Sequence, residues 1–80
     1  WPSAFTYYKK KLLKVFSAKA ILLKHKEKPG TILDINKDGI LVATSKDAIL
    51  LKEVQLEGKK KISAYEFACG QRLKKGVLWD

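Results

Sequence analysis

Hydrophobic and polar residues alternate through most of the chain, which is the pattern of half-buried β-strands. Residues 5–8 are rich in strand-forming side chains. Residues 12–23 are partly apolar on both alternating faces, so we expect one long strand that bends or bulges midway. A helix is the alternative for this segment, but Val15, Phe16 and Ser17 in its middle are weak helix formers.

Turn signals separate five predicted strands. Residues 9–11 form a polar turn without glycine, and Pro29-Gly30 closes the polar link that follows the long strand. Residues 36–39 predict a hairpin in which Asp-Gly supplies the positive φ angles, and residues 45–47 predict a second turn. Turns spaced by roughly ten residues favour a small barrel or sandwich. The remaining strands are expected over residues 31–36, 40–44 and 48–56.

One short helix is predicted near the C-terminus. Ser63 and Glu66 have capping-box spacing, in which the Ser63 hydroxyl accepts from the Glu66 N–H and the carboxylate reaches back to the Ser63 N–H. Ile62 and Phe67 are spaced to form a hydrophobic staple. Gly70 is expected to end the helix in the left-handed conformation. The sequence therefore predicts a mainly β fold with one short α-helix.

The chain is strongly basic, and its charge lies in two stretches. It has 80 residues and a formal net charge of +9. Residues 9–28 hold eight lysines against one glutamate, and residues 59–80 hold six basic residues against two acidic ones. A fold that brings these stretches together would build one positive face suited to nucleic acid. A lysine-rich source is the alternative explanation, but lysine outnumbers glutamate sixteen to four.

Size and composition exclude several kinds of protein. Eighty residues form a single domain, and a hydrophobic fraction of 46% suffices for a packed core. One cysteine forms no internal disulfide, and with one histidine it builds no zinc site. The longest apolar runs have four residues, far fewer than the roughly 20 needed to span a bilayer. The absence of methionine indicates a piece of a longer polypeptide.

The sequence offers no candidate catalytic residue. His25 stands between two lysines and is expected to be an exposed loop residue. Cys69 is expected to pack in the core from the end of the short helix. Asp34, Asp38 and Asp47 fall in or beside turns, where aspartate is common for structural reasons. A binding function is better supported than an enzymatic one.

Basic residues next to aromatic ones favour contact with RNA. Tyr7 and Tyr8 adjoin the lysines of residues 9–11, a combination used against nucleic acids. Adjacent strand residues face opposite sides, so only one tyrosine can point outward, and both can instead serve the core or its rim. The lysines of residues 59–61 precede the capped helix, where a phosphate can meet free N–H groups. We predict phosphate contacts from Lys9, Lys10, Lys11, Lys59, Lys60, Lys61, Arg72, Lys74 and Lys75.

An ordered set of motifs resembles the C-terminal domain of the methionyl-tRNA formyltransferase family. The motifs lie at residues 1–6, 29–34, 38–44 and 54–64. The resemblance implies an OB-like Greek-key barrel with a short helix, a monomer that holds the phosphate backbone of initiator tRNA in the cytoplasm. It also implies an N-terminal catalytic domain of the same chain that uses 10-formyltetrahydrofolate, so no cofactor and no membrane partner are expected for residues 1–80.

Two other functions remain open at this point. The matching domain of a related formyltransferase or formyl-folate hydrolase would have less need of a basic face. A purely structural interaction module would only brace its catalytic partner. A membrane-surface role ranks third, because no amphipathic helix accompanies the lysine runs.

Overall fold

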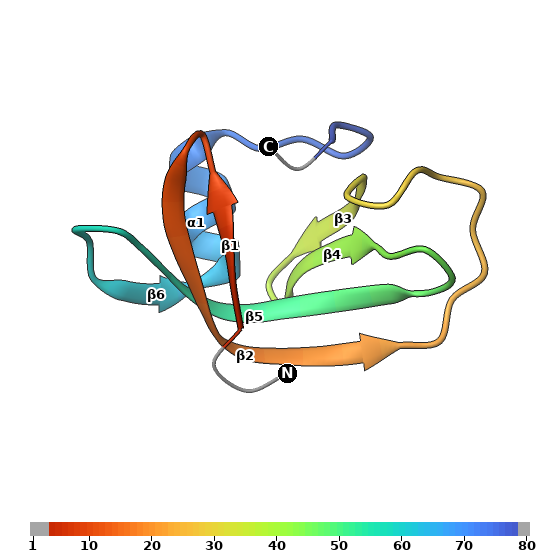
Figure 1. Ribbon diagram of the computed structural model, residues 1–80, viewed down its shortest axis with the longest axis horizontal. Coiled ribbons are helices and arrows are strands. Elements are labelled where there is room, and N and C mark those ends of the chain that lie inside the picture. The colour runs from red at the N-terminus through yellow and green to blue at the C-terminus, as the bar shows by residue number, and fades with distance from the viewer. Residues whose placement is uncertain (1–3, 79–80) are drawn as a thin grey trace.

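The chain folds into one open antiparallel sheet with a helix packed on it (Figure 1). The computed structural model describes residues 4–78, so residues 1–3 of the opening motif and residues 79–80 lie outside it. The sheet has six strands in the order β1-β2-β5-β4-β3, with β6 paired to β5. The elements are β1 (Ala4–Tyr8), β2 (Lys11–Ile21), β3 (Ile32–Asn36), β4 (Gly39–Ala43), β5 (Ala48–Leu56), β6 (Lys61–Ser63) and α1 (Ala64–Gln71).

The mainly β class with one short helix is confirmed. Within residues 4–78 no strand pairing joins β1 to β3, so the sheet is barrel-like in its curvature and is not closed. The strand predictions hold to within one residue except at the end of β2, which stops at Ile21 and not at Leu23. The strand β6 was not predicted, because its three residues are too short for an alternating pattern.

The predicted bulge lies in the middle of β2. Register shifts occur on either side of Ser17, and Phe16 has no directly paired residue on β5. Before the shift Leu13 and Val15 are buried, and after it Ala18 packs against the core. The bend lets one strand serve two parts of the sheet: Figure 1 shows β2 pairing with β1 at one end and running along β5 at the other.

The helix is held at its start by the predicted cap. The Glu66 N–H donates to the Ser63 hydroxyl at 3.0 Å, as expected of a capping box. The Glu66 carboxylate differs from the prediction, because it accepts from the Ser63 hydroxyl at 3.3 Å rather than from the Ser63 N–H. Ala64, Phe67 and Ala68 are buried and form the face of α1 that meets the sheet.

The predicted helix end at Gly70 is wrong, because the helix continues to Gln71 and Arg72 takes the left-handed conformation. The N–H of Arg72 donates to the Cys69 carbonyl and that of Leu73 to the Ala68 carbonyl, at 3.2 and 3.0 Å. This is a Schellman motif, in which the residue after the left-handed one makes an apolar contact. Leu73 packs against the core. That anchor sets the helix end, although glycine would adopt the left-handed conformation more easily.

The β3–β4 hairpin differs in detail from its prediction. Its turn residues are Lys37 and Asp38, and Asn36 pairs with Gly39. The positive φ is at Gly39, at 142°, and not at Asp38, whose N–H instead donates to the Asn36 side chain at 2.8 Å. Gly39 is required for a second reason, because a Cβ at this position would collide with the backbone carbonyl of Leu51.

The chain after α1 returns to the sheet beside β3 (Figure 1). Gly76, with a φ of 83°, donates its N–H to the Ile32 carbonyl at 2.7 Å. The Ile32 N–H in turn donates to the Val77 carbonyl at 2.8 Å, and Thr31 bridges to Leu78. The turn at Gly76 therefore places the C-terminal segment along the start of β3.

Candidate nucleic-acid interface

The β1–β2 turn presents three of the predicted lysines. Lys9 and Lys10 are the turn residues, with φ of 49° and 70°, and Lys11 begins β2. Positive φ at both central residues is typical of a type I′ hairpin turn, whose twist matches that of the strands. Asn and Gly normally fill such positions, so the two lysines hold a conformation that is costly for their residue type.

The turn is fixed against the helix by aromatic packing. Tyr8 is buried, and its ring meets that of Phe67 in α1 edge-on, with 5.1 Å between the centroids. The Lys9 Nζ lies 5.5 Å from the centroid of the Tyr8 ring. The basic end of the hairpin is therefore carried on a rigid contact with α1.

The β5–β6 loop brings further lysines to the same helix. Its shape is held by two hydrogen bonds, from the Lys59 N–H to the Leu56 carbonyl at 2.9 Å and from the Gln55 amide to the Lys59 carbonyl at 2.8 Å. Lys59 and Lys60 are exposed and line a cavity of about 270 Å³ together with Gly70 and Gln71 of α1. Loop and hairpin turn thus both border α1.

Lys61 is separated from the other two lysines of its run. As a residue of β6 it faces the opposite side from Ile62, which packs against the core. Its Nζ lies 5.3 Å from the centroid of the Phe16 ring in β2. The lysine run of residues 59–61 is therefore divided between two faces of the molecule.

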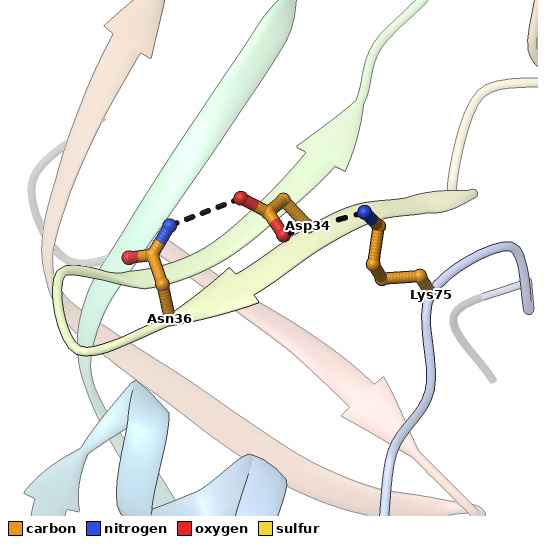
Figure 2. Close-up of polar contacts among 3 residues, drawn as sticks. All are labelled: Asp34, Asn36 and Lys75. Carbon is orange, nitrogen blue, oxygen red and sulfur yellow. Dashed lines mark hydrogen bonds and ion pairs between the residues drawn. The ribbon is translucent and has the colours of Figure 1, made fainter.

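The three basic residues after the helix also divide. Arg72 caps α1, next to the residues that line the cavity, and Lys74 is exposed in the following segment. Lys75 lies beside β3, where its Nζ is 3.8 Å from Oδ1 of Asp34, while Oδ2 of the same carboxylate accepts from the Asn36 amide at 3.1 Å (Figure 2). An exposed ion pair of this kind contributes little to stability, but it compensates the Lys75 charge.

The prediction that His25 is simply an exposed loop residue is wrong. Its ring is half-buried, and Nε2 lies 2.6 Å from the Asp47 carbonyl oxygen. Nδ1 accepts from the Glu27 N–H at 3.1 Å, so the ring proton of the neutral form is on Nε2 and is donated to Asp47. His25 ties the β2–β3 loop to the β4–β5 turn and has a structural role.

The prediction that Cys69 packs in the core is also wrong, because its side chain is exposed. The buried face of α1 follows Ala64, Phe67 and Ala68, which turns the next residue outward. A hydrogen bond with Cys69, its neighbour four residues along the helix, raises the pKa of the Tyr65 phenol, with the charge of Cys69 as a further cause.

Tyr7 and Phe16 are aromatic residues on the outside of the sheet. Of the adjacent tyrosines, Tyr8 is buried and Tyr7 is 59% exposed, as the opposite directions of neighbouring strand residues require. Phe16 is 51% exposed at the bulge, and Lys14 lies between the buried Leu13 and Val15. The alternation of buried and exposed residues along β2 signals an outward direction for both Lys14 and Phe16.

The candidate interface belongs to a chain in which, over residues 4–78, no helix is long and apolar enough to cross a membrane. A family model described as formyl transferase, C-terminal domain, matches residues 1–72. The match includes the β1–β2 turn, the β5–β6 loop and α1 with its Arg72 cap.

Proteins named methionyl-tRNA formyltransferase are similar over nearly the whole chain. That of Caldicellulosiruptor saccharolyticus is 49% identical over 80 residues, which cover 98% of this chain and 26% of the relative. That of Clostridium tetani is 40% identical over 80 residues, covering 100% and 26%. That of Desulfotalea psychrophila is 40% identical over 73 residues, covering 91% and 23%. The chain spans about a quarter of the length of these relatives.

Proposed function

The chain belongs to the formyl transferase C-terminal domain family, and from that membership we propose that it is the tRNA-binding domain of a methionyl-tRNA formyltransferase. The observation that carries the proposal is the convergence of two basic segments on one helix. Lys9 and Lys10 are held there through the Tyr8–Phe67 contact, and Lys59 and Lys60 border the cavity beside the end of α1.

The proposed mechanism is electrostatic attachment to phosphates. Lysines act as point charges without the planar fork that reads bases, so they position an RNA without specifying its sequence. Lys11, Arg72 and Lys74 extend the basic surface around α1, whereas Lys61 and Lys75 stand apart from it. We assign the main phosphate contacts to Lys9, Lys10, Lys11, Lys59, Lys60, Arg72 and Lys74, with Lys61 and Lys75 as peripheral contacts.

The chemistry of the parent enzyme is proposed to lie in another domain. An N-terminal domain of the same polypeptide would bind 10-formyltetrahydrofolate and transfer the formyl group to initiator methionyl-tRNA in the cytoplasm. Residues 1–80 would then hold the RNA substrate and contribute no cofactor ligand. The similarity of the chain to about a quarter of each relative supports this division.

The experiment that tests the proposal measures binding of the 80-residue chain to tRNA at low salt. Lys59→Glu combined with Lys60→Glu reverses two charges beside α1. We expect this variant to weaken binding by about tenfold or more, because each lost phosphate contact also removes counterion release.

A matched control carries the same charge change elsewhere. Lys26→Glu combined with Lys28→Glu alters exposed residues of the β2–β3 loop, which lies on the side of the sheet away from the β1–β2 turn in Figure 1. The control variant is expected to bind much more tightly than the Lys59 and Lys60 variant. Equal losses would show that only net charge matters, and no binding at low salt would overturn the proposal.

A further inference from the structure

Among the side chains that the structure describes, two exposed aromatic rings lie on the outer face of β1 and β2, and the proposed phosphate contacts leave them unexplained. Tyr7 is 59% exposed and Phe16 is 51% exposed. Tyr7 pairs with Leu12 across the hairpin. Leu12, Lys14 and Phe16 then follow at every second position of β2 and therefore lie on the same side. Both rings thus belong to one surface.

The register of three strands places two lysines beside these rings. Lys14 on β2 pairs with Gln55 on β5, and Gln55 pairs with Lys61 on β6. The two lysines therefore stand on either side of Gln55, on the same face as Phe16. The Lys61 Nζ is 5.3 Å from the Phe16 ring centroid. Exposed cation–π contacts are weak, so the ammonium can turn to an incoming phosphate and leave the ring to a base.

A groove continues the surface from Lys14 towards the β5–β6 loop. It has a volume of about 240 Å³ and is lined by Leu12, Lys14 and Gln55 among others. Glu57 also borders it, but its Oε1 accepts from the Leu12 N–H at 3.2 Å, which engages the carboxylate. The surface therefore combines apolar rings, two cations and a shallow depression.

We propose that this face stacks unpaired bases of single-stranded RNA, a site that rests on the proposed function and extends it beyond phosphate contact. Its residues, here called the aromatic strip, are Tyr7, Leu12, Lys14, Phe16, Gln55 and Lys61. Aromatic side chains in a basic groove accept any base, because every base has a stacking face. The bulge beside Phe16 supports the assignment, since β-bulges are over-represented next to functional sites.

The spacing of the rings sets how much RNA the strip holds. Leu12, the partner of Tyr7, is four residues from Phe16 along β2, which corresponds to about 13 Å. One base cannot bridge that distance, so each ring takes a different base, with Lys14 between them and Lys61 beside Phe16. The two cations favour a polyanion over an apolar protein surface as the occupant.

The test compares two RNAs that carry the same number of phosphates. Fluorescence anisotropy gives the affinity of the 80-residue chain for an unstructured single strand and for a blunt duplex. Phe16→Leu keeps an apolar side chain but removes the stacking ring. We expect it to weaken single-strand binding by about five- to 100-fold and to change duplex binding by less than about twofold. Phe16→Tyr should restore the single-strand affinity.

Tyr7→Leu is expected to act in the same direction as Phe16→Leu. Leu22→Ala is the matched control, since Leu22 is an exposed apolar residue outside the strip, and its affinities should not change. The proposed role of the aromatic strip would be overturned if Phe16→Leu weakened binding of both the single strand and the duplex, or of neither. If neither changes while a protein partner is lost, the face is a protein-docking surface. Failure of the proposed function looks different, because no tRNA binding would occur even in the unaltered chain.

Discussion

The ring of Tyr8, the last residue of β1, meets the ring of Phe67 in α1 edge-on, with 5.1 Å between the centroids and 76° between the planes. Both side chains are buried. Pairs of this geometry contribute about 0.5–1.5 kcal/mol beyond the burial of their surface. Because Lys9 and Lys10 follow Tyr8 directly, the contact sets where two of the proposed phosphate-binding lysines stand relative to the helix.

Removal of the helix partner is expected to weaken both the fold and the interface. Phe67→Ala should lower the free energy of unfolding by about 3–5 kcal/mol, since it empties a buried aromatic position. Phe67→Leu should lower the free energy of unfolding clearly less than Phe67→Ala does, and it should retain most of the affinity for tRNA. Urea denaturation followed by circular dichroism measures the stability. A loss below about 1 kcal/mol for Phe67→Ala would contradict the assigned packing.

The strained β1–β2 turn predicts a conflict between stability and binding. Lys10 has a φ of 70°, which glycine adopts more easily. Lys10→Gly is therefore expected to stabilise the fold by about 1 kcal/mol while it weakens tRNA binding through the lost charge. Lys10→Ala removes the same charge and keeps the backbone strain, so it should weaken tRNA binding without stabilising the fold. Thermal denaturation and tRNA binding of the two variants distinguish these effects.

Two glycines with positive φ separate backbone strain from steric collision. Gly58→Ala meets no atom within 4 Å, so strain alone should lower the free energy of unfolding by about 1 kcal/mol. Gly39→Ala adds a collision with the Leu51 carbonyl and should lower the free energy of unfolding by about 3 kcal/mol. Chemical denaturation of both variants provides the comparison. Equal losses would mean that β4 and β5 are not as close at Gly39 as described.

The contact between Tyr65 and Cys69 predicts an effect on alkaline titration. The hydrogen bond with Cys69 raises the Tyr65 pKa above the usual 10.0, so Cys69→Ala should lower it. A raised pKa stabilises the fold below the usual value, and this stabilisation is lost as the pH rises through the raised value. Ultraviolet titration of the phenolate absorbance in Cys69→Ala should show one tyrosine ionising earlier. An unchanged titration curve would contradict the hydrogen bond assigned between Tyr65 and Cys69.

Local sequence signals predicted most of the fold. The wrong predictions concern features that are determined by tertiary packing. The alternation around Phe16 predicted the bulge, and Ser63 predicted the helix cap, because both depend on neighbouring residues. The helix end depended on the core contact of Leu73, which no local pattern indicates. The outward direction of Cys69 was accessible from the helical period once the buried positions of α1 were identified.

The candidate site was only partly predictable for the same reason. The basic runs were visible in the sequence, but strand register separated Lys61 from Lys59 and Lys60. Lys75 lies close to Asp34 because the C-terminal segment returns to β3. Contacts of this kind join segments that are far apart in the sequence, so neighbouring residues do not signal them.

The salt dependence of tRNA binding tests the central claim most directly. For the unaltered 80-residue chain, the logarithm of the affinity should fall linearly with the logarithm of the salt concentration, by about 0.7–0.9 per phosphate contacted. Replacement of Lys9, Lys10, Lys59 and Lys60 by alanine should flatten the slope by about three units. An unchanged slope in this variant would contradict the account, because the RNA would then be held away from the surface around α1.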